Sequence, residues 1–195
     1  MPTTKLIAIS GSTRTGSYNS ALLRLAVRTA ADAGADVTLL SAQDMDLPIY
    51  NGDLEARDGL PAKVLQLQAL FASSAGFLIA SPENNACVSA LLKNTLDWVS
   101  RGVPASQGGP SSVWPYKGKT AALLAASPGA LGGLRGLVAL RAIMQTLGVL
   151  VLAEQHALSL AHQAFDEAGE LKDPRQAAAM TAVVQRLVSI ASRLG

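Results

Sequence analysis

The sequence predicts a single α/β domain, residues 1–195, built on a doubly wound five-stranded parallel sheet with helices on both faces. Two observations lead to this fold class: short apolar runs alternate with longer segments of helical periodicity, and no internal repeat or low-complexity tract interrupts them. A chain of 195 residues can bury a sizeable core. Its 49% hydrophobic and only 4% aromatic residues suit helices packed on a sheet of branched side chains.

Five apolar segments have the length and composition of buried parallel strands. They cover Lys5–Ser10, Asp36–Leu40, Gly76–Ala80, Thr120–Ala126 and Val149–Leu152. The polar, proline-containing residues 41–59 predict a loop after the second strand. Residues 101–119, rich in Gly, Pro and Ser, predict the longest loop.

Five further segments repeat apolar residues at helical spacing. The predicted helices run from Tyr18 or Asn19 to just before Gly34, from Pro61 to Phe71, from Val88 to Val99, from Leu137 to Leu147, and from Pro174 to Leu194. Pro61 suits a first helical turn because its missing N–H costs little there. Gly34 and Gly148 stand where helices are expected to end.

Composition and charge exclude several classes of protein. The formal net charge is +2, and no block of Lys and Arg suited to a nucleic-acid backbone is present, so we expect no nucleic-acid partner. No apolar run approaches the ~18 residues that span a bilayer, so we expect no membrane association. The single cysteine, Cys87, excludes an internal disulfide and fits the cytoplasm. His156 and His162 lack clustered carboxylates, which predicts no metal site.

Three loops rich in turn residues and small polar groups follow the first, third and fourth strands. They read GSTRTGSYN, SPENNA and SPGALGG. Ligands of open α/β sheets bind outside the carboxyl ends of the strands. With the strand order 2-1-3-4-5, these three loops converge at one place, which makes them the candidate site.

The first loop has the composition of an anion-binding loop. Gly11 and Gly16 let the backbone approach an anion, Ser12 and Ser17 supply hydroxyls, and Arg14 supplies a positive charge. The helix that follows directs its free N–H groups to the same place. Tyr18 either packs beside the anion or faces the core, and Asn19 either binds the ligand or caps the helix.

Two common nucleotide motifs do not match this loop. The spacing from Gly11 to Gly16 is that of a nucleoside-triphosphate loop, but Ser17-Tyr18 replaces the Lys-Ser/Thr pair that such a loop needs. Thr13 occupies the second glycine position of the dinucleotide fingerprint, and no acidic residue closes the second strand. The loop therefore suits a single terminal phosphate.

Together, the three loops resemble the NADPH-dependent FMN reductase family. The first pattern is G-S-x-R-x-x-S-x-N over Gly11–Asn19, and the second is Ser81–Asn85 running into the helix LLKNTLDWVSR. The third covers Ser127–Gly133 and Arg135. The resemblance extends over about residues 4–155.

The resemblance implies a flavodoxin-like fold and an enzyme that passes hydride from NADPH or NADH through bound FMN to a small-molecule acceptor. That acceptor would be a quinone, an azo or nitro compound or a metal oxyanion, and the protein would be a homodimer or homotetramer. The flavin carries this chemistry, so no side chain is expected to be catalytic. The residues implied to bind the cofactor are Gly11, Ser12, Arg14, Ser17, Tyr18, Asn19, Pro82, Glu83, Asn84, Asn85, Ser127, Gly129 and Gly132.

The second segment departs from the family pattern at two positions. Asn84 stands where members usually have Tyr, and Ala86 replaces a common Gly. Loss of the ring removes apolar contact worth on the order of 1 kcal/mol, which predicts weaker FMN retention or a wider cleft. Glu83 either lies near the flavin or pairs across a subunit interface. Cys87 is expected to be a small buried side chain at a helix start.

Two other functions are alternatives to the reductase. A flavodoxin-type electron carrier is typically acidic, which steers it to basic partners; a pI of about 8.9 favours the enzyme instead. A flavin-free protein that binds a phosphate-bearing ligand is the other alternative, and the absent Tyr at Asn84 gives it some weight.

Overall fold

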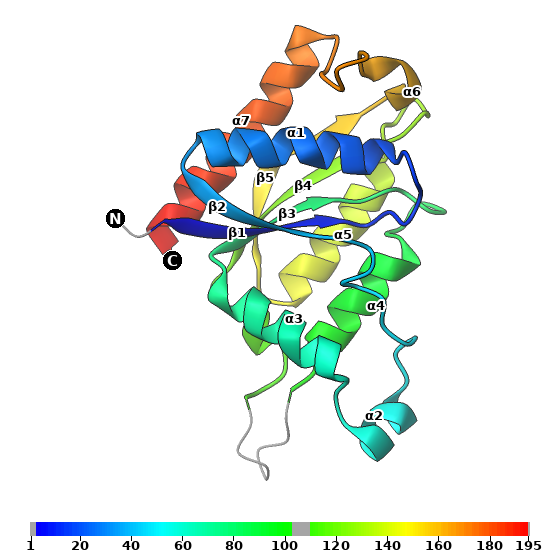
Figure 1. Ribbon diagram of the computed structural model, residues 1–195, viewed down its shortest axis with the longest axis vertical. Coiled ribbons are helices and arrows are strands. Elements are labelled where there is room, and N and C mark those ends of the chain that lie inside the picture. The colour runs from blue at the N-terminus through cyan, green and yellow to red at the C-terminus, as the bar shows by residue number, and fades with distance from the viewer. Residues whose placement is uncertain (1–2, 103–109, 195) are drawn as a thin grey trace.

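The computed structural model describes residues 3–102 and 110–194, and it confirms the predicted fold class. A five-stranded sheet has the order β2-β1-β3-β4-β5, and every neighbouring pair is parallel (Figure 1). The strands are β1 (Thr4–Ser10), β2 (Ala35–Leu40), β3 (Gly76–Ala80), β4 (Thr120–Ala126) and β5 (Leu150–Leu158). Residues 103–109 of the predicted long loop lie outside the described residues.

Helices cover both faces of this sheet. They are α1 (Tyr18–Asp32), α2 (Gly52–Asp58), α3 (Ala62–Ser73), α4 (Ala90–Val99), α5 (Leu134–Thr146), α6 (Ala161–Ala164) and α7 (Pro174–Leu194), with a short 3-10 helix, η2 (Trp114–Tyr116). Figure 1 shows α1 and α7 on one face and α3, α4 and α5 on the other. The fold is therefore flavodoxin-like, with three layers.

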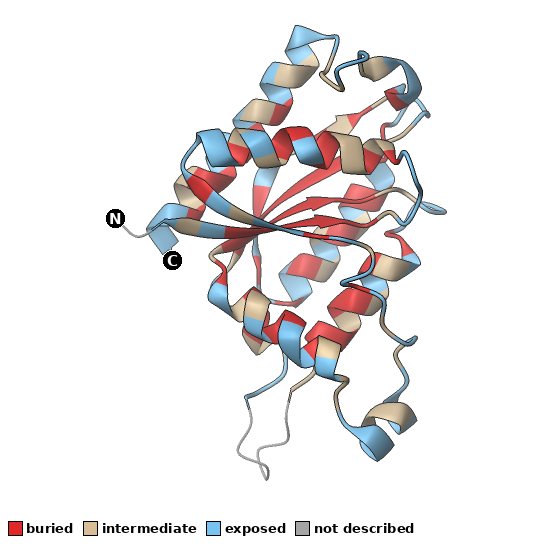
Figure 2. Ribbon diagram, in the orientation of Figure 1, coloured by how far each residue is buried: buried red, intermediate tan, exposed pale blue. Residues whose placement is uncertain are grey.

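The alternation of side chains along the strands produces two separate hydrophobic cores. In β1, Leu6 and Ala8 pack with α1 and α7, while Ile7 and Ile9 pack with α3, α4 and α5. All four residues are buried, and Figure 2 shows the middle of the sheet coloured as buried. The central strands are thus apolar on both faces, and this explains their continuous apolar runs in the sequence.

Two helices occur where the sequence predicted only loops. No residue of α2 is buried, so its sequence carries no apolar stripe. The Asn51 side chain caps the start of this helix by accepting the Asp53 N–H. The helix ends at Gly59, whose φ is 76°. The other, α6, is a single turn of four residues. Helix α4 begins at Ala90 rather than Val88 because Ser89 caps it.

The fifth strand is longer than predicted. It extends to Leu158, six residues past the predicted end at Leu152, because an irregularity hides its pattern: Ala121 pairs with Val151, but Leu123 pairs with Gln155. Arg141 donates to the carbonyl oxygens of Leu152 (2.6 Å) and Ala153 (3.4 Å) in the displaced segment. His156 was predicted to follow this strand; it lies within it and is buried.

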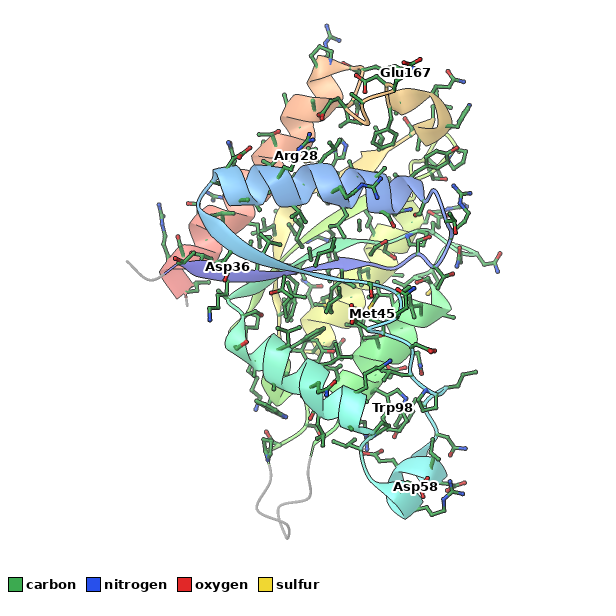
Figure 3. All side chains as sticks on the ribbon, in the orientation of Figure 1. Arg28, Asp36, Met45, Asp58, Trp98 and Glu167 are labelled. Atoms are coloured by element: carbon green, nitrogen blue, oxygen red, sulfur yellow. The ribbon has the colours of Figure 1, made fainter. Side chains whose placement is uncertain are left out.

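The segment after β2 packs its apolar residues inward. Met45 and Trp98, marked in Figure 3, are both fully buried. The Trp98 indole N–H donates to the Pro48 carbonyl at 2.7 Å, and its ring meets Tyr50 edge-on at 5.0 Å. The side chain of Asn94 donates to Pro48 as well. These contacts fasten residues 45–50 to α4.

Candidate active site

A cleft of about 470 Å³ opens at the carboxyl ends of β1, β3 and β4, where the three predicted loops meet. It is lined by Gly11, Ser12, Thr13, Arg14, Ser17, Tyr18, Asn19, Pro82, Glu83, Asn84, Ser89, Ala90, Leu91, Ala126, Ser127 and Pro128. All but three of the predicted cofactor-binding residues are among them. The exceptions are Asn85, Gly129 and Gly132.

Strand pairing continues past the strand ends and brings the loops together. The Gly11 N–H donates to the Ala80 carbonyl at 2.9 Å, and the Ser127 N–H donates to the Leu158 carbonyl at 3.0 Å. A Cβ on Gly11 would lie 3.2 Å from both Pro82 and the Ser89 hydroxyl. The Ser89 hydroxyl donates to the Gly11 carbonyl at 2.5 Å. Gly11 is therefore the point where the first two loops touch.

The first loop surrounds the start of α1 with donors. Ser17 caps the helix, its hydroxyl accepting the Ser20 N–H at 3.3 Å, and Gly16 takes the left-handed backbone that turns the chain into it. The first turn of α1 holds no acidic residue. Its remaining free N–H groups and the positive end of the helix dipole therefore face the cleft uncompensated.

Arg14 lies over the Tyr18 ring, with its guanidinium carbon 5.0 Å from the ring centre. This cation–π contact holds the charge at the cleft. Arg14 Nη2 also donates to the Gly16 carbonyl at 3.5 Å. Tyr18 also packs against the core that contains α1 and α7. Of the two alternatives for this residue, the structure shows the contact with the core. Tyr18 also lines the cleft, and its packing beside an anion stays a prediction.

Asn19 joins the first loop to the third. Its side-chain amide donates to the Ala126 carbonyl at 2.9 Å and accepts the Ala126 N–H at 2.9 Å, and all these groups are buried. Ser17 performs the capping that the sequence left open for Asn19. Both ends of the Asn19 side-chain amide bond to Ala126 of β4, so Asn19 positions the cleft wall.

Glu83 is turned toward α5. Its carboxylate accepts the N–H groups of Arg135 (3.0 Å) and Gly136 (3.2 Å) and the Arg135 Nε–H (2.7 Å). Burial opposes the charge of Glu83, but the Arg135 side chain and the two backbone donors outweigh it and lower the pKa of Glu83. The ion pair that was considered across a subunit interface is formed within the chain.

Residues 84–87 form a tight, exposed hairpin turn beside the cleft. Asn84 and Cys87 exchange backbone hydrogen bonds of 3.0 Å, and the two residues between them, Asn85 and Ala86, have φ values of 52° and 62°. Asn tolerates the left-handed region, whereas Ala86 is strained in it. Cys87 was expected to be buried and is exposed, because it closes this turn before α4 begins.

The third loop contributes mostly through packing. Ser127 lines the cleft, and its hydroxyl accepts the Gly129 N–H at 3.2 Å. Gly132, with φ 63°, lies against β5: a Cβ there would stand 2.8 Å from the backbone of Ala157. Gly132 is therefore required by backbone contact rather than by a ligand.

Six residues of the lining are absent from the predicted cofactor-binding set, namely Thr13, Ser89, Ala90, Leu91, Ala126 and Pro128. Ser89 carried a signal, since a serine directly before an apolar helical pattern is typical of a helix cap. Ala126 carried none, because its part is played by the backbone.

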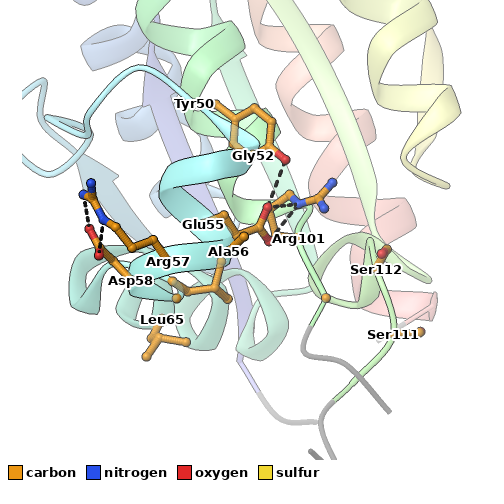
Figure 4. A pocket seen from close by; sticks show the side chains of 13 residues that line it. Tyr50, Gly52, Glu55, Ala56, Arg57, Asp58, Leu65, Arg101, Ser111 and Ser112 are labelled. Carbon is orange, nitrogen blue, oxygen red and sulfur yellow. Dashed lines mark hydrogen bonds and ion pairs between the residues drawn. The ribbon is translucent and has the colours of Figure 1, made fainter. Parts of the chain in front are cut away.

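A larger hollow of about 980 Å³ lies beside α2 and shares no residue with the cleft (Figure 4). Its charged side chains are paired with one another. Glu55 accepts from Arg101 Nε at 3.0 Å and from the Tyr50 hydroxyl at 2.9 Å, and Arg57 pairs with Asp58.

Among the described residues, no group of three or more His, Cys, Asp or Glu side chains is placed to hold a metal ion. None of the helices that the structure describes is long and apolar enough to cross a membrane.

Comparison with known proteins assigns the class. The family model for NADPH-dependent FMN reductase matches residues 4–163. A probable NADPH:quinone oxidoreductase of Oryza sativa is 33% identical over 193 residues, covering 97% of this chain and 90% of the relative. An NAD(P)H-dependent FMN reductase of Pseudomonas aeruginosa is 37% identical and covers 88% and 86%.

Solved structures agree with this assignment. FerB, a flavoenzyme NAD(P)H:(acceptor) oxidoreductase from Paracoccus denitrificans, superposes with a TM-score of 0.81 at 26% identity, covering 98% of this chain and 99% of that one. An archaeal flavodoxin superposes with a TM-score of 0.60 at 9% identity, which shows the shared fold alone.

The fold and the cleft define a flavin-dependent oxidoreductase. More specifically, the chain belongs to the NADPH-dependent FMN reductase family. The sequence predictions of the family, of an oxidoreductase, and of FMN with NAD(P)H are confirmed at this level.

The cleft also fits FMN on its own geometry. A side chain at Gly11 would fill the space against Pro82 and Ser89. Hydroxyls, an arginine and the open start of α1 provide the donors that a phosphate monoester requires.

Proposed function

We propose that this chain is an NAD(P)H-dependent quinone reductase that acts through FMN held in the cleft of Gly11–Asn19. The observation that carries the proposal is the meeting of the acid-free start of α1, Arg14 and the hairpin segment Pro82–Asn84 at one cleft. The names of the relatives in rice and Pseudomonas support the donor and the acceptor class.

Different residues of the cleft would bind the phosphate and the ring of the cofactor. Ser12, Arg14 and the hydroxyl of Ser17 would hold the phosphate, together with the first N–H groups of α1. The segment Pro82–Asn84 and the apolar side chain of Leu91 would flank the ring. When bound, FMN supplies the hydride chemistry.

No side-chain acid or base is needed for this function. The one carboxylate among the described residues of the lining, Glu83, is occupied by α5. The residues of the cleft therefore bind, orient and exclude water. A quinone is the acceptor we propose first; azo, nitro and metal-oxyanion acceptors are the alternatives that an activity panel distinguishes.

The proposed role of Arg14 in holding the phosphate is tested with Arg14→Ala. The apoprotein of this variant is titrated with FMN and, separately, with riboflavin. Loss of a charged donor worth about 1.5–3 kcal/mol predicts roughly 10- to 150-fold weaker FMN binding, with riboflavin binding unchanged. Arg24→Ala, which removes an exposed arginine of α1 outside the cleft, is the matched control. Equal losses for FMN and riboflavin would contradict the placement of the phosphate.

Catalysis is tested by adding NADPH anaerobically to the FMN-loaded protein and following the visible absorption. Rapid bleaching, reversed by a quinone, is the expected result. Slow bleaching would favour the electron carrier. A protein that does not bind added FMN would overturn the proposal in favour of the flavin-free alternative.

We also propose that the chain forms a homodimer or homotetramer. Leu131, Leu134 and Val138 form an exposed apolar stripe at the start of α5. Light scattering on the purified protein checks this assembly, and a monomer at micromolar concentration would contradict it.

A further inference from the structure

The contact between Glu83 and α5 joins the cleft wall to a helix that contributes nothing else to the lining. The Glu83 side chain is only 9% exposed, although its partner Arg135 is 62% exposed. Its two oxygens meet two backbone donors of the first turn of α5 and the guanidinium of Arg135, which comes within 2.5 Å. This carboxylate therefore caps α5 from another part of the chain.

Glu83 and the residues near it pack closely against the backbone of α5 at Gly136. A Cβ added to Gly136 would stand 3.1 Å from the Glu83 Cβ and 3.2 Å from the Cys87 carbonyl oxygen. The hairpin turn of residues 84–87 is otherwise exposed. The position of this turn beside the cleft therefore depends on the contact between Glu83 and Gly136.

The same contact balances charge at this end of the cleft. The start of α5 carries the positive end of a helix dipole, and Arg135 adds a full positive charge. The first turn of α5 contains no acidic residue of its own, so Glu83 supplies the negative charge that compensates both. The low pKa of Glu83 keeps it ionised at neutral pH.

We infer that Glu83 and Arg135 are a positioning pair that also sets the reduction potential of the bound flavin, by holding a balanced pair of charges beside the ring end of the cleft. This inference rests on the proposed function. A reduced flavin anion carries negative charge that oxidised flavin lacks, so nearby charge stabilises the two forms unequally. Removing the negative partner favours the reduced form, and removing the positive partner favours the oxidised form.

The two single variants therefore shift the potential in opposite directions. In Glu83→Gln, reduced FMN should bind threefold to tenfold more tightly relative to oxidised FMN than in the wild type. For a two-electron couple this raises the midpoint potential by about 14–30 mV. Arg135→Gln should lower it by a similar amount, and the double variant should return close to the wild-type value.

The experiment is a potentiometric titration of each FMN-loaded variant, with the melting temperature recorded in parallel. Glu170→Gln and Arg28→Gln remove the partners of an ion pair outside the cleft and serve as matched controls, expected to leave the potential unchanged. Arg135→Gln keeps both backbone bonds of Glu83, so it provides the measurement if Glu83→Gln does not fold.

A purely structural role would move both single variants in the same direction, or would lower the melting temperature without changing the potential. Either result overturns the inference. A wild-type protein that binds no FMN would overturn the proposed function instead, so the two failures are distinguishable.

Discussion

The two walls of the cleft are built in different ways. The phosphate loop, Gly11–Asn19, is anchored by the buried amide pair between Asn19 and Ala126 and by the Ser17 cap. The hairpin wall, Pro82–Cys87, is exposed over residues 84–87 and is tied to α5 by the Glu83 carboxylate. It also has Ala86 in a left-handed conformation.

This difference separates two tasks. A rigid wall suits a phosphate, whose donors must hold one geometry. Side chains of the exposed wall can change at little cost to the core, and this wall holds Asn84 and Ala86, where the resemblance predicts a departure from the family pattern. Four substitutions test this division.

Asn19→Ala should have the largest effect, because it leaves both the N–H and the carbonyl of Ala126 without partners inside the protein. We expect a loss of about 3 kcal/mol in the free energy of unfolding, measured by urea denaturation. FMN binding should weaken as well. Asn84→Ala in the exposed wall is the control, with an expected change below about 0.5 kcal/mol. Equal losses in the two variants would show that the walls are equally rigid.

Glu83→Gln should cost about 1–2 kcal/mol at neutral pH, the range of a lost helix cap. The pKa of Glu83 is lowered in the folded state from 4.5, so its stabilisation is present above that pH and is lost as the pH falls through the folded pKa. The difference in unfolding free energy between wild type and variant should therefore shrink below about pH 4.5. A difference that does not vary with pH would mean that the charge contributes nothing.

Asn84→Tyr tests the departure from the family pattern. A ring at this lining position should add apolar contact worth about 1 kcal/mol, or roughly fivefold tighter FMN binding. Fluorescence titration of the apoprotein measures it. Asn84→Ala, which adds no ring at the same position, is the control. If Asn84→Tyr leaves the affinity for FMN unchanged, residue 84 does not contact the flavin.

Ala86→Gly should have the smallest effect and the opposite sign. Glycine removes the strain of a left-handed alanine, but it also increases the conformational freedom of the unfolded chain. We expect the free energy of unfolding to rise by up to about 1 kcal/mol. Ala142→Gly, the same change on the exposed side of α5, should instead cost about 1 kcal/mol. Thermal denaturation compares the two, and a loss of stability in both would refute the strain at Ala86.

The sequence alone predicted the five strands and the three loops, because the central strands are apolar on both faces and each loop contains glycine or proline. Apolar patterns do not determine a strand order; the order 2-1-3-4-5 was taken from the flavodoxin-like fold, and the structure confirms it. The sequence did not predict α2, which buries nothing and so leaves no periodic signal. It also placed the end of β5 too early, because the irregularity at residues 152–154 breaks the strand pattern.

The site shows the same limit. Donors that act through their own side chains, such as Arg14 and Ser17, are visible as residue types. The partners of Asn19 and Glu83 are not, because both side chains bond to backbone groups far along the chain, and backbone groups look alike in every sequence. Only the fold shows that these two residues join loops to one another.

The bond between Asn19 and Ala126 also has a consequence for the order of assembly. The two residues are 107 positions apart, so the phosphate loop lacks its anchor until β4 has entered the sheet. A growing chain on the ribosome therefore cannot complete this pocket from its first strand and helix, although those carry most of the phosphate donors. Binding of the cofactor would thus indicate that β4 has joined the sheet.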